Sequence, residues 1–236
     1  MTLVLLIRHG RSTANSSGVL AGWTPGVRLD ERGEQQAGEL AKRLAEVPLA
    51  AAVVSPLERC RQTADLVLAG RDGLPVHLDE RIGECRYGDW TGRTLAELAQ
   101  EPLWRTVQAH PSAARFPGPD GESMADMSAR AVAAVREWNT LIAAEHGPEA
   151  VWALFSHGDI IKALAADALG LHLDQFQRIT CDPCSVTAVR YTELRPFVLR
   201  LNDVGGDPAP YKPATERSPS ADGDAAVGGG AGADNT

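Results

Sequence analysis

The sequence is short of two features that would place it in a special class: cysteine and long apolar runs. Four cysteines in 236 residues are too few for the disulfide scaffold of a small secreted domain. No apolar run reaches the roughly 18–20 residues that a membrane-spanning helix needs. The N-terminus also lacks the basic segment and cleavage site of a secretory signal. We therefore expect a soluble, cytoplasmic protein.

Positive charge is also scarce. The chain has 23 Lys and Arg against 31 Asp and Glu, which gives a net charge of −8 at pH 7. This balance argues against a nucleic acid or an anionic membrane surface as the main partner.

Metal-binding patterns are missing as well. The acidic residues are scattered without paired ligand spacing, and Cys181 and Cys184 have neither a second pair nor a nearby histidine. We predict no metal and no other cofactor. Cys184 and Arg190 have the spacing of a tyrosine-phosphatase loop, but the residues between them are typical of a strand, so we interpret the match as coincidence.

The chain does contain a regular alternation of strand and helix patterns, which predicts a mostly parallel sheet covered on both faces. Asp30 is a predicted N-cap for a helix ending near residue 46, and Ser123 with Asp126 resembles a capping box at the start of a helix that stops at Gly147. A further helix is expected from His157 to Gly170. We expect strands at residues 3–7, 51–54, 75–78, 151–155, 186–191 and 196–201.

Two further segments stand out by composition. Residues 203–236 are rich in Gly, Ala, Asp, Pro and Ser, so we predict a domain of residues 1–202 followed by a disordered tail that catalysis does not need.

The segment of about residues 91–120 is interrupted by prolines and carries several large apolar residues. A connection this long is usually functional, and two interpretations carry equal weight: a cap over a crevice, or a helical surface excursion that packs its own Trp and Leu.

The strongest functional signal is a pair of histidines, each at the end of an apolar strand. Leu3–Ile7 leads into Arg8-His9-Gly10, and residues 151–155 lead into Ser156-His157-Gly158. Ligands bind beyond the carboxyl ends of parallel strands, which places both imidazoles where chemistry is expected. The pattern suggests a phosphoryl-transfer site.

Further motifs follow in order along residues 3–200. They are Ser12 and Asn15, Leu29-x3-Gly33-x2-Gln36-Ala37, Ser55-Pro56-Leu57-x-Arg59-x2-Gln62-Thr63-Ala64, Glu84-x2-Tyr87-Gly88-x-Trp90-x-Gly92 and Gly121-Glu122-Ser123. Together with the two histidine motifs, they resemble the histidine phosphatase superfamily, also called the phosphoglycerate mutase-like family. The resemblance implies a three-layer α/β/α sandwich with a mixed, mostly parallel six-stranded sheet. It also implies a metal-independent phosphatase acting on a small phosphomonoester, commonly as a homodimer.

The residue types suit this chemistry. His9 is the expected nucleophile, which would become a phosphohistidine, and His157 is the expected second imidazole, acting as a cation if it is protonated. Arg8 and Arg59 provide planar guanidinium groups for phosphate oxygens. The other expected substrate-binding residues are Ser12 and Asn15 as neutral donors, Gly158 at a helix N-terminus, and Arg11, where the family commonly has Glu or Gln.

The leaving group needs a proton, and the resemblance assigns this role to Glu84. Asp159 is the rival acid, because some acid-phosphatase branches place an aspartate directly after the second histidine. A phosphoglycerate mutase that uses the same phosphohistidine is the first alternative function. A catalytically silent phosphate-binding module is the second.

Overall fold

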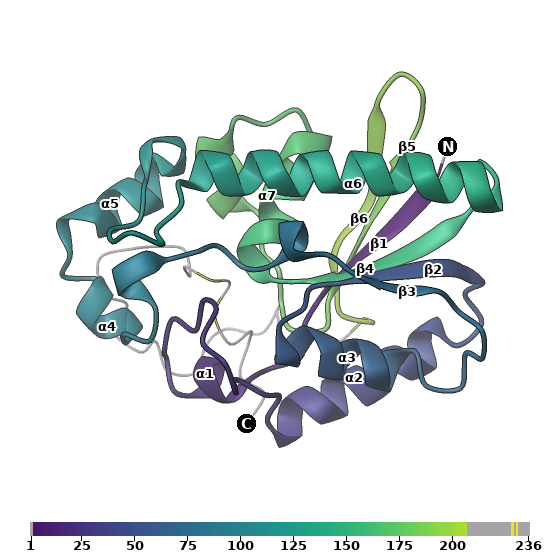
Figure 1. The fold of residues 1–236 in the computed structure, drawn as a ribbon, viewed down its shortest axis with the longest axis horizontal. Coiled ribbons are helices and arrows are strands. Elements are labelled where there is room, and N and C mark those ends of the chain that lie inside the picture. Colours follow the sequence, from purple (N-terminus) through teal and green to yellow (C-terminus); the bar gives the residue numbers. More distant parts are fainter. Residues whose placement is uncertain (1, 207–227, 229, 231–236) are drawn as a thin grey trace.

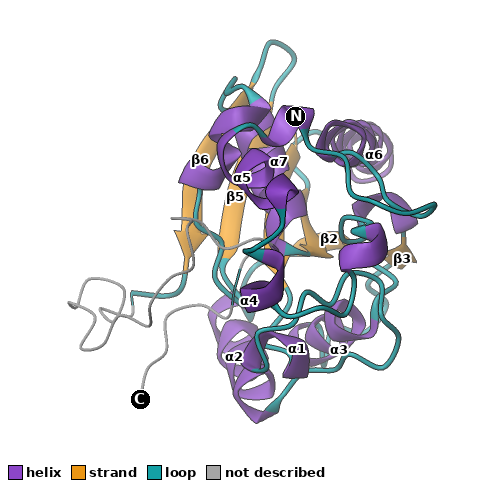
Figure 2. Cartoon of the chain, turned by 90° about the vertical axis from the view of Figure 1, so that its left-hand side faces the viewer, coloured by secondary structure: helices purple, strands orange, loops and turns teal. Residues whose placement is uncertain are grey.

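The computed structural model describes residues 2–206, 228 and 230, and it consists of one mixed sheet between two helical layers (Figures 1 and 2). The strands are β1 (Thr2–Arg8), β2 (Leu49–Val54), β3 (Val76–Leu78), β4 (Val151–Ser156), β5 (Val186–Tyr191) and β6 (Pro196–Asp203). Their order in the sheet is β3-β2-β4-β1-β5-β6. β1 to β4 run parallel, whereas β5 pairs antiparallel with both β1 and β6. The predicted fold class is confirmed.

Side chains alternate along β1 between the two faces of the sheet. Leu5 and Ile7 pack with helices α2 (Glu31–Leu44) and α3 (Glu58–Val67). Val4 and Leu6 pack on the opposite face, in the core shared with α6 (Met124–His146) and α7 (Gly158–Ala168). A strand covered on both faces reads as a continuous apolar run, which explains the pattern at the N-terminus.

The helix boundaries follow their capping residues. Asp30 accepts from the backbone N–H of Gly33 at 2.8 Å, which begins α2 as predicted. Ser123 accepts from the N–H of Asp126 at 3.0 Å and begins α6, but this is a simple N-cap without the reciprocal half of a capping box. The aspartate side chain instead binds Arg115 at 2.8 Å.

The segment of residues 91–120 is helical and packs into the core. It contains α4 (Leu95–Leu98), α5 (Pro102–Ala109) and a turn of 3-10 helix at Pro111–Ala113. Leu98, Val107 and Phe116 are buried in the same core as the α6 side of the sheet. Its apolar residues therefore connect it to the domain rather than forming a separate core.

Four further short helices are α1 (Thr13–Ser16) and the 3-10 turns Glu80–Ile82, Gly88–Trp90 and Leu173–Arg178. No helix in the described part of the chain has both the length and the apolar character required to cross a bilayer. The predicted tail lies mostly outside the described residues. Within it, β6 continues to Asp203, which pairs with Arg43 at 2.8 Å.

Candidate active site

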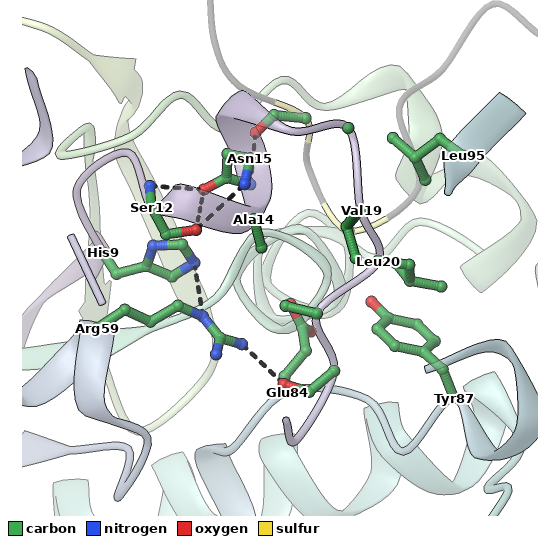
Figure 3. A pocket seen from close by; sticks show the side chains of 15 residues that line it. His9, Ser12, Ala14, Asn15, Val19, Leu20, Arg59, Glu84, Tyr87 and Leu95 are labelled. Atoms are coloured by element: carbon green, nitrogen blue, oxygen red, sulfur yellow. Dashed lines mark hydrogen bonds between the residues drawn. The ribbon is translucent and has the colours of Figure 1, made fainter. Parts of the chain in front are cut away.

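The carboxyl ends of β1, β2 and β4 meet at one edge of the sheet and bring the predicted functional residues together. The register pairs Arg8 with Ser156, so His9 and His157 follow at the same level, with ring centroids 5.3 Å apart. A pocket opens beside them (Figure 3). Its polar lining includes His9, Asn15, Arg59 and Glu84, and its apolar lining includes Leu20 and Leu95.

The ring of His9 is held in one tautomer. Its Nδ1 lies 2.7 Å from the carbonyl oxygen of Gly10, and a carbonyl only accepts, so Nδ1 carries the proton. Nε2 is then unprotonated and accepts from Arg59 Nε at 3.3 Å. Burial, followed by the charges of Arg59 and Arg8, holds the pKa of His9 well below its usual value. The ring is therefore neutral at pH 7 and presents a lone pair to the pocket.

A close contact between two glycines fixes the turn that carries His9. A Cβ on Gly10 would lie 2.6 Å from the carbonyl oxygen of Gly33, and a Cβ on Gly33 would lie 2.0 Å from that of Arg11. Only glycine fits such an approach, which brings the first turn of α2 against the end of β1.

Arg59, in the first turn of α3, bridges the two histidines. Besides His9, its guanidinium reaches the Nδ1 of His157 at 3.2 Å and donates to the carbonyl of Gly22 at 3.0 Å. It is 2% exposed, so its charge acts in a site from which water is largely excluded.

His157 is also fully buried, and its two nitrogens have different partners. Because Nδ1 accepts from Arg59, the proton lies on Nε2, which donates to Ser55 Oγ at 2.8 Å. Burial and the charge of Arg59 lower the pKa of His157 well below its usual value, so this arrangement holds a neutral ring. The cationic form expected from the sequence therefore requires a bound anion that favours it. The neighbouring Cys60 thiol is no rival nucleophile, since burial raises its pKa to about 12.

Glu84 lies in the loop before the Gly88–Trp90 turn, lines the pocket and approaches His157. Its Oε2 is 3.8 Å from His157 Nδ1, and its Oε1 accepts from the N–H of Cys85 at 3.0 Å. Burial, and next the charge of Asp159, raise the pKa of Glu84 to about 7. A carboxyl with this pKa donates and accepts protons near neutral pH.

Arg8 and Asn15 converge on one acceptor. The carbonyl oxygen of Gly230 accepts from Arg8 Nη2 and, at 3.4 Å, from Asn15 Nδ2. Arg8 Nη1 donates to the carbonyl of Cys181 at 2.7 Å. The two side chains therefore direct donors to one point beside α1, where a backbone oxygen lies. We name this pair of side chains the anion clamp, since the sequence predicts that both bind phosphate.

For three other residues that were predicted to bind substrate, the structure shows another partner or a position outside the pocket lining. Ser12 lines the pocket, but its hydroxyl donates to Asn15 Oδ1 at 2.8 Å, so it caps α1 and orients Asn15. Arg11 forms an ion pair with Asp30 at 2.8 Å and does not line the pocket. Gly158 begins α7 directly behind His157 and is also not part of the lining. For Ser12 and Arg11 the sequence gives the residue type but not the direction of the side chain.

Two residues contribute to the site although the sequence predicted no role for them. Ser55 orients His157, and its position after a strand was the available signal. Tyr87 lines the pocket and belongs to one of the quoted motifs, but its type alone suggests no role. Among the described residues no group of three or more His, Cys, Asp or Glu side chains is placed to hold a metal ion.

Comparisons with known proteins give the family model that the chain matches and proteins of similar sequence and fold. Residues 4–204 match the family model of the histidine phosphatase superfamily, branch 1. Phosphoserine phosphatase 1 of Hydrogenobacter thermophilus is 31% identical over 210 residues, which cover 86% of this chain and 92% of that protein. The 2,3-bisphosphoglycerate-dependent phosphoglycerate mutase 2 of Gloeobacter violaceus is 28% identical over 193 residues, 81% and 86% of the two chains. The structure of Bacillus stearothermophilus YhfR superposes with a TM-score of 0.77 at 30% identity, covering 86% of this chain and 98% of that one.

Proposed function

The chain belongs to the histidine phosphatase superfamily, and from this membership we propose a reaction in which His9 takes the phosphoryl group from a small phosphomonoester. The protein is a histidine-dependent phosphatase. The observation that supports His9 as nucleophile is its fixed tautomer, with a neutral ring and an unprotonated Nε2 that faces the pocket.

In the first step, the Nε2 lone pair of His9 forms a bond to phosphorus while the bond from phosphorus to the ester oxygen breaks. In this proposal, Arg8, Asn15 and Arg59 bind the three equatorial oxygens, which carry the negative charge of the phosphoryl group in the transition state. The N–H of His9 Nδ1, bound to the Gly10 carbonyl, stabilises the cationic ring that forms.

Glu84 serves as the proton donor in this proposal. Its protonated form transfers a proton to the departing alkoxide, and the resulting carboxylate then takes a proton from the water that attacks the phosphohistidine. The products are the alcohol and inorganic phosphate, and His9 and Glu84 return to their starting states. A pKa of about 7 supports both roles.

Hydrolysis is favoured over mutase activity because three of the remaining cations are paired with carboxylates. A mutase needs cations beyond the phosphate clamp to hold a second anionic group. In the segment of residues 91–120, Arg93 is paired with Glu101 at 2.7 Å and Arg115 with Asp126 at 2.8 Å. Arg11, on the other side, is paired with Asp30. The apolar Leu95 is the part of the segment that lines the pocket, which supports its role as a cap that tolerates an uncharged leaving group.

Rapid-quench labelling tests the proposal. Brief incubation with a ³²P-phosphomonoester should give a phosphoenzyme that is stable to alkali and labile to acid, and His9→Ala should abolish both label and turnover. His110→Ala, which changes an exposed histidine remote from the pocket, is the control. A label on serine or cysteine would contradict the assignment, and absence of both turnover and label in the native protein would favour the silent phosphate-binding module.

The mutase alternative has its own measurement. The enzyme is given 3-phosphoglycerate with a trace of 2,3-bisphosphoglycerate, and 2-phosphoglycerate and free phosphate are followed together. We expect phosphate release to predominate. Isomerisation much faster than release would make the chain a mutase.

Homodimer assembly and a cytoplasmic location are further parts of the proposal. β6 lies at the edge of the sheet and exposes Phe197, Leu199 and Leu201, which supports contact with a second copy because an unpaired apolar edge favours association. The small number of cysteines, all four of them free and buried, supports a reducing compartment. Light scattering on the purified protein tests the assembly, and cell fractionation tests the location.

A further inference from the structure

A buried carboxylate that the proposed reaction does not use lies behind the pocket. Asp159, in the first turn of α7, is 1% exposed. Its Oδ2 accepts from the hydroxyl of Tyr87 at 2.9 Å, and Tyr87 lines the pocket (Figure 3). Its Oδ1 lies 3.8 Å from Lys162 Nζ and has no hydrogen-bond partner in the described part of the chain. A buried carboxylate oxygen with unused acceptor capacity is costly unless something donates to it.

Lys162 does not satisfy this capacity. Its ammonium group donates to Gln177 Oε1 and lies 4.5 Å from the centroid of the Phe176 ring, and it approaches Oδ1, whereas Tyr87 donates to Oδ2. Lys162 balances the charge of Asp159, and Tyr87 orients the Asp159 carboxylate. The acceptor that Tyr87 and Gly228 contact is the other oxygen, Oδ2, and both of these residues line the pocket.

Gly228 and Gly230 show what this arrangement binds. The N–H of Gly228 donates to Asp159 Oδ2 at 3.2 Å, while the carbonyl of Gly230 accepts from Arg8 and Asn15. Both glycines line the pocket. Gly230 thus places an acceptor in the anion clamp, and Gly228 places a donor on Asp159. A phosphomonoester would make the same pair of contacts if its alcohol carried a donor of its own.

We propose that Asp159 selects the leaving group, accepting a hydrogen bond from a hydroxyl or ammonium group on the alcohol part of the phosphomonoester. This assignment rests on the proposed function and deepens it: the substrate class is phosphorylated alcohols with a second hydrogen-bond donor, such as polyols or amino alcohols. A carboxylate accepts hydrogen bonds but does not donate them. It therefore favours substrates that carry a hydrogen-bond donor over substrates that carry only acceptors. A plain alkyl group would leave Asp159 desolvated without a partner, and sites built to bind a donor discriminate strongly against analogues that lack one.

Asp159 is a specificity residue here and not the acid. Its Oδ2 accepts from the hydroxyl of Tyr87, which lines the pocket. Glu84, by contrast, is the carboxyl placed against His157. Burial, and next the charge of Asp159, raise the pKa of Glu84 to about 7, which suits Glu84 to proton transfer near neutral pH.

Matched substrates test the proposal. Glycerol 3-phosphate is compared with propyl phosphate for a hydroxyl donor, and O-phosphoethanolamine with ethyl phosphate for an ammonium donor. The readout is the ratio of kcat/KM within each pair. Both members need the same proton from Glu84, so the ratio is insensitive to the protonation of Glu84. The native enzyme should favour the donor substrate of at least one pair by about tenfold or more.

Variants assign the preference to Asp159. Asp159→Ala removes the acceptor and should bring the preferred pair's ratio close to one. Asp159→Asn keeps an oxygen acceptor without the charge, so it should reduce an ammonium preference more than a hydroxyl preference. Tyr87→Phe keeps the carboxylate but removes the group that orients it, and it should lower the ratio even if the Asp159 variants fail to fold. Asp167→Asn, on the same helix but paired with Arg136 away from the pocket, is the matched control and should keep the native ratio.

Calorimetry on the His9→Ala protein separates the two possible failures. If this protein binds a donor substrate more tightly than its alkyl partner while the native protein hydrolyses neither, the proposed reaction fails and the role of Asp159 stands. If the native protein hydrolyses both members of each pair equally well, or if the ratio survives in Asp159→Ala, the role of Asp159 is refuted and the phosphatase reaction stands.

Discussion

Arg59 donates from Nε to the Nε2 of His9 across 3.3 Å, so a cation contacts the very nitrogen that is proposed to attack phosphorus. The same guanidinium contacts His157. In the reaction, the phosphoryl group would take over both contacts of Arg59 with the imidazoles. The site is therefore preorganised by the cation that later binds the transferred group.

Arg59→Lys should lower kcat/KM by about 10²-fold, because an ammonium group is a point charge and does not bridge two imidazoles and a carbonyl as the planar guanidinium does. Steady-state kinetics on one alkyl phosphate measures this. Arg61→Lys, an exposed change on the same helix, should leave kcat/KM unaltered. Equal kinetics for both variants would show that Arg59 is structural.

The pH profile should report Glu84. Since the protonated form is the donor, kcat/KM for an alkyl phosphate should fall tenfold per pH unit above pH 7, where the pKa of Glu84 lies. Glu84→Gln should lower kcat/KM by about 10²–10⁴-fold and remove this limb. The loss should be smaller with p-nitrophenyl phosphate, whose leaving group departs as a stable anion. A basic limb that persists in Glu84→Gln would exclude this carboxyl as the acid.

The same residue should reduce stability at alkaline pH. Its pKa is raised from 4.5 to about 7 in the folded state, so the folded protein retains a proton that the unfolded chain releases between these values. Stability is therefore lost as the pH rises through this window. Glu84→Gln should exceed the native protein in free energy of unfolding by up to about 3 kcal/mol at pH 8, with little difference at pH 4.5.

Urea unfolding at several pH values measures this difference. The lowered pKa values of His9 and His157 act in the opposite direction, costing stability as the pH falls below 6.5, but they are common to both proteins and cancel in the comparison. The exposed Glu46→Gln variant is the control. A difference between Glu84→Gln and the native protein that does not vary with pH would show that its origin is packing.

Activity should survive exhaustive chelation with EDTA, because Arg8 and Arg59 supply the positive charge that a metal would otherwise provide. Vanadate, which mimics five-coordinate phosphorus, should inhibit competitively. Activity that disappears with EDTA and returns with a divalent cation would contradict this prediction.

The sequence alone predicts a dispensable tail, but the contacts of Gly228 and Gly230 with Arg8, Asn15 and Asp159 change that expectation. A chain ending at Gly206 keeps β6 and the Arg43–Asp203 pair, so its Tm should not change. Its KM should fall by a few fold at constant kcat, since a backbone oxygen no longer competes for the anion clamp. An unchanged KM would show that the tail does not compete in solution.

The fold was largely predictable because its signals are local. β5 has the predicted bounds, and Asp30 and Ser123 cap their helices through their own side chains. The positions of His9 and His157 follow from strand ends, which a sequence displays directly.

What the sequence did not predict depends on side-chain direction and on distant partners. Arg11 has the type of a phosphate ligand, but Asp30 lies close enough to hold it away from the pocket. Ser12 has the type of a donor, but its hydroxyl is used at the start of α1. The contact between Tyr87 and Asp159 joins residues 72 positions apart, and no local pattern indicates it.

The contact between Gly10 and Gly33 has a consequence for engineering. This contact joins the two ends of the loop that connects β1 to α2. The loop contains Ser12, Asn15, Leu20 and Gly22, which form one wall of the pocket. Backbone atoms make the contact between the two ends of this loop, so the contact does not depend on the side chains within the loop. The segment between Gly10 and Gly33 should therefore be exchangeable between members of the superfamily. If both glycines are retained, the exchange should replace one wall of the pocket without moving the nucleophile His9.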